Sequence, residues 1–491
     1  RRKAHSSPNS VTSRISFLLD DRLVSLDFHD PSCPGPTTTI LNYLRSLPNH
    51  KGVKEGCAEG DCGACTVVLG ELDQVGKIRY KSVDSCLAFL PMLHRKNLIT
   101  VENLADAASD LHPVQQAMVD TNGSQCGYCT PGFIMSLFSL YKNSSHPSQR
   151  QIDDALTGNL CRCTGYRPIV QAAATSCVHE GRDKFSEMEA KTSDVLQSVA
   201  PDTLHVKTRS QEYFRPLSLT EALAFKRQHP DALFISGATD VALRVTKRHE
   251  VLASIIDLSG IDELSRVTDS TASLRIGAGV TMNEMMTHCA KDFAAIHSIL
   301  SVFGSQQIRN LATIGGNLGT ASPIGDTLPL LIAYDAKVAL QSLLGKREVP
   351  IDDFFTGYRQ TVRKPDELVT AVILPKTGGA AAVRAYKVSK RKDLDISTVS
   401  GGFRIEVDEL KSVGRIKLAY GGMADRPKRA STVEKYLTGK TWSREIVEQG
   451  MALVEKDFSP ISDARAGAEF RMAAARNLLL KFWSDTSGEG A

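Results

Sequence analysis

Short apolar runs separated by polar turns fill the first part of the chain, and this pattern predicts strands with a single helix. Residues 13–30 contain two such runs that meet at 20–22, which indicates a tight β-hairpin. Apolar residues at helical spacing follow over 39–45, and residues 66–69 indicate a further strand. We therefore expect a small sheet crossed by one helix, ending near residue 95.

The next segment changes to a helical period. Apolar positions recur at helical spacing from residues 111, 131, 152 and 169, which predicts four short helices in a compact bundle. Residues 181–208 are rich in Glu, Lys, Ser and Asp and hold few apolar anchors, so we expect a linker there.

Strands and helices alternate from residue 214 onward. Residues 232–241 form an apolar strand that runs into a glycine turn, with a helix expected at 242–244. The last segment is expected to be a sheet backed by helices, with strands at 383–388, 398–406 and 415–420 and helices near 431–437, 443–455 and 463–483.

Length and charge narrow the class of protein. At 491 residues the chain has room for about three or four domains. Its net charge of +4 is spread without a long basic run, so we expect no nucleic acid and no membrane as partners. No apolar stretch has the length of a secretory signal or a membrane span. A soluble, cytoplasmic protein is the prediction.

Three cysteines, Cys57, Cys62 and Cys65, stand in the spacing C-x4-C-x2-C, and Cys86 follows later. This is the ligand spacing of plant-type [2Fe–2S] clusters. Small residues among them leave room for backbone to wrap around a cluster. A structural zinc site is the alternative, but zinc sites usually pair their cysteines as two C-x2-C units. We predict a first [2Fe–2S] cluster at these four thiols.

Two further cysteine pairs lie in the helical segment: Cys126 with Cys129, and Cys161 with Cys163. A C-x2-C pair combined with a C-x-C pair is unusual for zinc, and thioredoxin-like redox chemistry would need only the first pair. We predict a second [2Fe–2S] cluster here. The remaining cysteines have no partner spacing and are expected to be ordinary small side chains; they are Cys33, Cys177 and Cys289.

The two cysteine sets, with the sequences 125–132 and 157–166 around the second set, resemble the iron–sulfur region of the xanthine dehydrogenase and aldehyde oxidase family of molybdenum hydroxylases. All eight ligand positions of that family are present. In the family, the cluster of the helical bundle lies nearest a molybdopterin cofactor, and Gln125 and Cys163 match positions that approach the pterin. By itself, Gln125 is equally an exposed residue at a helix start.

Two glycine-bearing segments suit a diphosphate. The junction after the strand at 232–241 offers backbone N–H groups, although such junctions are common in α/β proteins. Residues 310–326 combine glycines with Thr, Ser, Asn and Asp. No G-x-G-x-x-G follows a first strand, so the usual dinucleotide fold is not expected.

Both segments resemble the FAD-binding domain of the same family, in which two α/β subdomains clasp an extended FAD. The resemblance implies FAD contacts at Phe234, Ile235, Ser236, Gly237, Ala238, Thr239, Asp240, Val241, Phe303, Thr313, Ile314, Gly315, Gly316, Asn317, Asp326, Val369 and Lys387. It also places Tyr358 near a nicotinamide. Residues 388–396 match a loop beside the flavin at which members differ between NAD+ and oxygen use. The charge run of this loop is equally typical of a solvated surface.

The resemblance covers nearly the whole chain and implies an α+β multidomain architecture. Its parts are a β-grasp 2Fe-2S ferredoxin-like domain, a four-helix 2Fe-2S-binding bundle, a linker, a two-subdomain α/β FAD-binding domain of the PCMH type and a C-terminal α+β flavoprotein domain like that of CO dehydrogenase, at 12–97, 98–180, 181–208, 209–378 and 379–485.

The implied function is that of an iron–sulfur and FAD small subunit of a xanthine dehydrogenase. Electrons from oxidation of hypoxanthine or xanthine at a molybdenum centre would pass through two 2Fe-2S clusters and FAD to NAD+. Molybdopterin would belong to a large partner subunit, in a heterotetramer with two of each chain, so we expect no catalytic acid or base in this chain. Two alternatives stay open: the small subunit of another molybdenum hydroxylase, for aldehydes or N-heterocycles, and an autonomous flavin and iron–sulfur electron-transfer protein.

Overall fold

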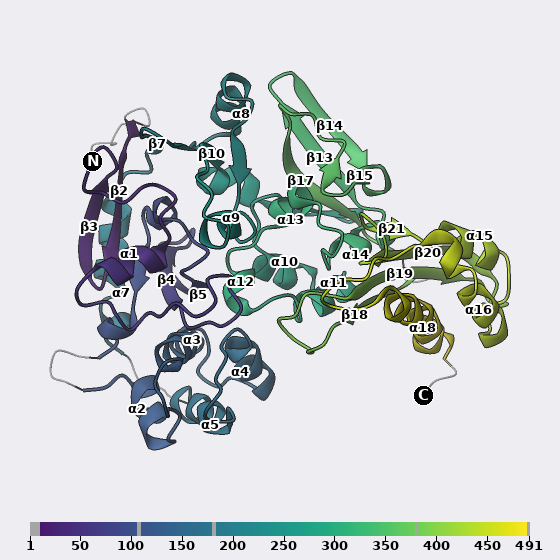
Figure 1. Ribbon diagram of the computed structural model, residues 1–491, viewed down its shortest axis with the longest axis horizontal. Coiled ribbons are helices and arrows are strands. Elements are labelled where there is room, and N and C mark those ends of the chain that lie inside the picture. The colour runs from purple at the N-terminus through teal and green to yellow at the C-terminus, as the bar shows by residue number, and fades with distance from the viewer. Residues whose placement is uncertain (1–9, 106–109, 179–182, 379–380, 489–491) are drawn as a thin grey trace. The chain divides into compact units, whose positions relative to one another are not determined.

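The computed structural model describes residues 10–105, 110–178, 183–378 and 381–488 (Figure 1). These residues divide into two compact units. Unit one holds the described residues up to Asp262 together with Ser305–Ala312, and unit two holds Glu263–Gly304 and the described residues from Thr313 onward.

A five-stranded sheet crossed by helix α1 (Ile40–Ser46) opens unit one. Its order is β3-β2-β6-β4-β5. Asp20 and Asp21 have positive φ angles of 48° and 68°, as a tight two-residue hairpin turn requires, so the predicted hairpin is confirmed. The strands are β2 (Arg14–Leu19), β3 (Arg22–Asp27), β4 (Thr66–Leu72), β5 (Ile78–Asp84) and β6 (Asn97–Ile99).

Both faces of this sheet are buried. Phe17 and Leu69 pack in one core with the residues of α1. Their neighbours in the strands, Leu18 and Val68, point to the opposite face and pack in the core of the helical bundle. This double burial explains why these strands are apolar at successive positions rather than at alternate ones.

Four helices form the bundle, as predicted. Prolines stand in the first turn of three of them, where the missing N–H costs nothing. Helix α3 is central, because its apolar residues are buried from Phe133 to Tyr141. The helices are α2 (Pro113–Asp120), α3 (Thr130–Asn143), α4 (Gln149–Leu156) and α5 (Arg167–Ser176).

The described part of the predicted linker is ordered into helices and a strand. It forms α6 (Lys184–Glu187), α7 (Glu189–Ser198) and β7 (Thr203–Lys207). Two apolar residues, Phe185 and Leu196, are enough to anchor it, because both are buried in the bundle core. Residues 181 and 182 lie outside the described residues.

A second five-stranded sheet completes unit one, in the order β1-β7-β8-β10-β9. Its first strand comes from the start of the chain and pairs in parallel with β7, which sequence patterns did not indicate. The elements are β1 (Val11–Thr12), β8 (Glu212–Arg215), α8 (Leu219–Gln228), β9 (Leu233–Ile235), α9 (Ala242–Thr246), β10 (Ser254–Asp257) and α12 (Gln306–Arg309).

Unit two begins with an antiparallel sheet in the order β11-β12-β17-β13-β14. The strands are β11 (Val267–Asp269), β12 (Ser273–Gly277), β13 (Lys337–Ser342), β14 (Gly345–Pro350) and β17 (Leu368–Pro375). The helices α10 (Met282–Cys289), α11 (Ala294–Leu300), α13 (Ile314–Thr320) and α14 (Leu328–Ala333) and a hairpin of β15 (Phe355–Gly357) and β16 (Gln360–Thr361) belong to the same unit.

The last part of the chain forms a four-stranded sheet, and Figure 1 shows α18 along it. Strands and helices lie where the sequence predicts them, except that the helix expected at 443–455 is interrupted. The elements are β18 (Ala381–Val388), β19 (Val399–Val407), β20 (Val413–Gly421), β21 (Lys428–Arg429), α15 (Ser431–Leu437), α16 (Arg444–Met451), α17 (Val454–Asp457) and α18 (Ala468–Ser487). The α+β multidomain class is confirmed. Among the described residues, no helix has the length and apolar character to cross a membrane.

Candidate functional site

The loop between α1 and β4 carries three of the thiols predicted to hold the first cluster. Its backbone turns sharply, with positive φ angles of 56° at Ala58, 82° at Gly60 and 66° at Gly63. Glycine takes such angles without strain. The fourth thiol, Cys86, follows β5, and its Sγ lies 3.4 Å from that of Cys65. The sheet therefore brings a ligand that is distant in sequence to the loop.

The other two thiols of this loop also form a pair, in which the Cys62 thiol donates to the Cys57 sulfur. Backbone N–H groups of Glu59 and Asp61 donate to the same sulfur at 3.4 and 3.3 Å. The bond from Cys62, together with these amides, lowers the pKa of Cys57 to about 5, and the same bond raises the pKa of Cys62. Donors aimed at sulfur favour the thiolate, which is the form that binds iron.

The second set of thiols lies on two loops of the bundle. Cys129 is the N-cap residue of α3 and pairs with Cys161, and Cys126 pairs with Cys163. Thr164 donates to the Cys161 sulfur from its hydroxyl at 3.2 Å and from its N–H at 3.5 Å. Burial acts to raise the pKa of Cys161, but these donors outweigh it and the pKa is lowered.

The pairing of thiols suits a two-iron cluster better than a single ion. Four cysteines hold a [2Fe–2S] cluster, with two ligands at each iron, whereas a zinc ion needs its ligands around one point. The residues present therefore fit the predicted clusters.

The two thiol sets differ in exposure. Cys65 and Cys86 are buried, whereas Cys126 and Cys163 are exposed. Gln125, predicted to lie near a pterin, is also exposed, next to Cys126. The other two thiols of each set are partly exposed, so the second set is the more exposed of the two.

The first predicted FAD segment forms a tight turn after β9. Gly237 and Ala238 have positive φ angles of 76° and 60°. Among the described residues, the N–H groups of Gly237, Ala238 and Thr239 donate to no backbone carbonyl. Unpaired amides in such a turn form a concavity that suits an anion, so this segment fits a diphosphate. The close packing of Gly237 serves the protein itself, because a Cβ there would lie 1.8 Å from Leu311 O.

The second predicted FAD segment opens α13 and fits less directly. Its first amides are already used: Ile314 N donates to Val280 O at 3.1 Å, and Gly315 N donates to Ala278 O at 2.9 Å. Glycine is needed at 315 because a Cβ would lie 2.6 Å from Ala278 O. Packing against the protein by itself accounts for glycine at 315, and its contact with FAD stays a prediction. The side chain of Asn317, held by Thr327 Oγ1 at 2.5 Å, is better suited to meet a ligand.

Unit two brings Asp326 and Lys387 together, as the FAD resemblance would require. Lys387 Nζ donates to Asp326 Oδ2 at 2.7 Å and to Val302 O at 3.2 Å. Ser397 Oγ donates to Asp326 Oδ1 at 2.5 Å. The lysine and aspartate side chains are only 6 % and 7 % exposed, so their charges neutralise each other. Val369 is buried in β17.

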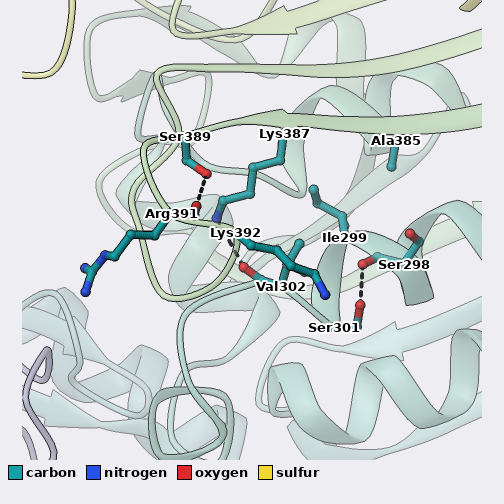
Figure 2. Close-up of a pocket in the computed structure, with 9 residues that line it drawn as sticks. All are labelled: Ser298, Ile299, Ser301, Val302, Ala385, Lys387, Ser389, Arg391 and Lys392. Carbon is teal, nitrogen blue, oxygen red and sulfur yellow. Dashed lines mark hydrogen bonds between the residues drawn. The ribbon is translucent and has the colours of Figure 1, made fainter. Parts of the chain in front are cut away.

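A cleft of about 400 Å³ adjoins this group in unit two, and Figure 2 shows the side chains that line it. Lys387, Arg391 and Lys392 belong to the lining. Two lining serines donate their hydroxyls to backbone carbonyls, Ser301 Oγ to Ser298 O at 2.7 Å and Ser389 Oγ to Arg391 O at 2.6 Å. Arg391 pairs with Asp395 at 2.6 Å. The cleft therefore lies beside the predicted flavin contact Lys387, and Phe303 follows the lining residue Val302 in sequence.

Tyr358 stands apart from these residues. It lies in the turn between β15 and β16, is 63 % exposed and does not line the cleft.

Sequence reasoning missed two hydrogen-bond donors: Thr164, which donates to the Cys161 sulfur, and Ser397, which donates to Asp326. Thr164 directly follows the C-x-C pair, and a hydroxyl there was a usable signal. Ser397 had none, because it meets Asp326 only through the fold.

Two paired sets of thiols and a glycine turn that suits an anion are the features expected of an iron–sulfur flavoprotein. Comparison with family models supports this class along most of the chain. The models match, in order, a 2Fe-2S iron-sulfur cluster binding domain at 30–89, a [2Fe-2S] binding domain at 100–174, a FAD binding domain in molybdopterin dehydrogenase at 207–377 and a CO dehydrogenase flavoprotein C-terminal domain at 384–486.

Curated relatives match nearly the whole chain. Xanthine dehydrogenase of Emericella nidulans is 33% identical over 530 residues, which covers 96% of this chain and 38% of the relative. Xanthine dehydrogenase/oxidase of Gallus gallus is 32% identical over 550 residues, which covers 97% of this chain and 40% of the relative. The chain belongs to the molybdenum hydroxylase family and corresponds to its iron–sulfur and FAD-binding region. It spans about two fifths of the length of these relatives.

Solved structures match part of the chain. Cu,Mo-CO dehydrogenase is 25% identical with a TM-score of 0.52 over 56% of this chain and 96% of that one. Quinoline 2-oxidoreductase from Pseudomonas putida 86 is 23% identical with a TM-score of 0.53 over 58% of this chain and 99% of that one, a likeness of fold alone.

Proposed function

We propose that this chain is the electron-transfer subunit of a xanthine dehydrogenase and delivers electrons from purine oxidation to NAD+. The molybdenum centre belongs to a large partner subunit, in a cytoplasmic heterotetramer. Hydroxylation of a purine carbon by water releases two electrons and two protons, and NAD+ takes up two electrons and one proton. [2Fe–2S] clusters accept electrons singly, and flavin exchanges two with nicotinamide.

The observation that carries this proposal is the graded exposure of two paired thiol sets. The exposed set, with Cys126 and Cys163, faces the partner, and Gln125 lies towards its pterin. The set with the buried Cys65 and Cys86 then carries electrons onward within this chain. A protein that takes electrons from another molecule needs one cluster near its surface. The more exposed set, with Cys126 and Cys163, suits that role, and the set with Cys65 and Cys86 suits the next step.

This chain's own residues hold the groups. The eight cysteines ligate the clusters in the pairs described, and the amides of Gly237–Thr239 hold the diphosphate of FAD. In unit two, the proposed FAD contacts include Asn317, Asp326, Val369 and Lys387. Tyr358 reaches the nicotinamide.

The choice of a purine rests on the curated relatives. Xanthine dehydrogenases align with 96% and 97% of this chain, through the iron–sulfur and the flavin segments alike. The CO dehydrogenase chain aligns with 56% of it. This chain carries the iron–sulfur segment and the flavin segment together, as the aligned xanthine dehydrogenases do, and this favours a xanthine dehydrogenase.

Replacement of one proposed ligand tests the proposal. In Cys163→Ser, we expect one of two EPR-distinguishable [2Fe–2S] signals to be lost, and purine oxidation in the complex with the partner to become uncoupled from NAD+ reduction. Cys177→Ser, a buried cysteine outside both sets, is the matched control and should keep both signals. Unchanged spectra in Cys163→Ser would refute the ligand assignment. Failure of a molybdenum-containing chain to co-purify would favour an autonomous electron carrier.

A further inference from the structure

The two ligand loops of unit one lie against each other backbone to backbone. A Cβ on Gly63 would lie 2.3 Å from Gly158 O, and a Cβ on Gly132 would lie 2.2 Å from Gly63 O. Only glycine permits such an approach. The loop with Cys62 and Cys65 therefore rests directly on the start of α3 and on the loop that leads to Cys161.

Three hydrogen bonds cross this contact, and each one starts in a loop of the second thiol set and ends in the loop of the first set. They run from Leu160 N to Cys62 O at 3.0 Å, from Asn159 Nδ2 to Gly63 O at 3.0 Å, and from Tyr128 OH to Glu55 O at 2.5 Å.

Asn159 is the centre of this contact. It is 2 % exposed. Its amide nitrogen also donates to Thr66 Oγ1 at 3.2 Å, and its oxygen accepts from Ser136 Oγ at 2.6 Å and from Gln307 Nε2 at 2.9 Å. Its full capacity of two donors and two acceptor sites is used. A buried amide with four partners is held in one orientation.

A purely stabilising asparagine would serve equally well with all of its bonds inside the bundle. The bonds of Asn159 instead join the bundle to the first ligand loop, and Asn159 is separated from the proposed ligand Cys161 by Leu160 alone. The bond from Leu160 N–H ends on Cys62, itself a proposed ligand. Covalent bonds lead from the Cys161 sulfur to the Leu160 N–H and from the Cys62 carbonyl to the Cys62 sulfur, with this one hydrogen bond between them.

We propose that Asn159 is a positioning residue that fixes the separation and orientation of the two clusters, and that the electron route between them crosses the hydrogen bond from Leu160 N–H to Cys62 C=O. This inference rests on the proposed function, because it requires clusters at both thiol sets. Rates of electron transfer fall steeply with distance, so a fixed contact between the ligand loops keeps the step fast.

Two variants of the full chain test the inference. Asn159→Leu keeps the branching at Cγ and the number of side-chain heavy atoms, and it removes the amide. Tyr128→Phe removes one crossing bond at a side chain that is 49 % exposed, so it tests the contact even if the buried variant does not fold. Tyr166→Phe is the matched control: Tyr166 is 40 % exposed, and its hydroxyl accepts from Cys161 N at 3.0 Å within the same loop.

Two quantities are measured: the magnetic splitting between the two reduced clusters in EPR, and the rate at which reduction of one cluster reaches the other in rapid mixing. We expect both variants to keep two iron signals with altered splitting, and Asn159→Leu to slow the transfer by about tenfold, as small misplacements of reacting groups do. Tyr166→Phe should leave the splitting unchanged.

Two intact signals with unchanged splitting and rate in both variants would overturn the inference and leave the proposed function standing. A wild-type chain that binds no iron would overturn the proposed function and this inference with it.

Discussion

His94 shows how a single buried side chain ties the stability of unit one to pH. Its Nδ1 accepts from Ser16 N at 3.2 Å, and its Nε2 faces Ala200 O at 3.1 Å. Both bonds are satisfied by the neutral ring, with the proton on Nε2. Burial, followed by the charge of Arg215, lowers the pKa of His94 from 6.5 to about 4.

The unfolded chain therefore binds a proton at this histidine below pH 6.5, and the folded chain does so only below about pH 4. The stabilisation is complete above the unfolded pKa and is lost as pH falls from 6.5 to 4, a loss of about 3 kcal/mol. In His94→Gln, we expect a lower melting temperature at pH 7.5 and a smaller drop on acidification than in the wild type. His146→Gln, at an exposed histidine, should follow the wild-type curve; parallel curves for all three proteins would contradict the prediction.

At the scale of elements, short-range sequence signals predicted those helices and turns that residues close in sequence determine. The hairpin follows from Asp20 and Asp21, which tolerate positive φ angles. The bundle follows from the helical periods that recur from residues 111, 131, 152 and 169. The order of the described residues from Lys184 onward was not predictable, because burial of Phe185 and Leu196 depends on a core assembled from distant segments.

The turn after β9 is an element whose function depends on one glycine. Gly237 has a φ angle of 76°, and a Cβ there would lie 1.8 Å from Leu311 O. Gly237→Ala should therefore displace the turn, lower the melting temperature and reduce bound FAD, since the amides that follow would no longer converge. Gly414→Ala in β20 is the control, because a Cβ there would lie 3.7 Å from Glu406 O, an ordinary contact distance, and Gly414 is in neither predicted FAD segment.

The two measurements are the FAD-to-protein ratio from absorbance and the melting temperature. A Gly237→Ala protein that melts like the wild type and carries a full complement of flavin would show that this turn does not hold the cofactor. A protein that melts early but retains its flavin would separate the packing role of the glycine from the proposed binding role.

At the scale of the whole molecule, the sequence predicted which cysteines belong to each cluster site. It did not predict how the fold brings those cysteines together. Spacing located all eight cysteines, but it did not indicate which thiols pair, because the pairing of Cys65 with Cys86 depends on the register of β4 and β5. It also did not indicate that the loops of the two sets touch, since Asn159 meets Gly63 only through the packing of the bundle on the sheet.

The proposed order of groups predicts that electrons also flow in reverse when the partner subunit is absent. If this chain delivers electrons to NAD+ through FAD, then NADH alone should reduce both clusters of the isolated, cofactor-loaded chain, with no purine and no molybdenum present. We expect both EPR signals to appear after NADH is added under anaerobic conditions. Dithionite provides the full signal for comparison.

A flavin-depleted sample of the same protein is the control. Dithionite should still reduce both clusters there, whereas NADH should reduce neither, because the nicotinamide exchanges two electrons at once and the clusters accept them singly. If NADH leaves the clusters of the loaded chain oxidised while dithionite reduces them, NAD+ is not the acceptor and the electrons leave the flavin for another molecule. If NADH reduces the clusters equally well without flavin, the proposed sequence of groups is wrong.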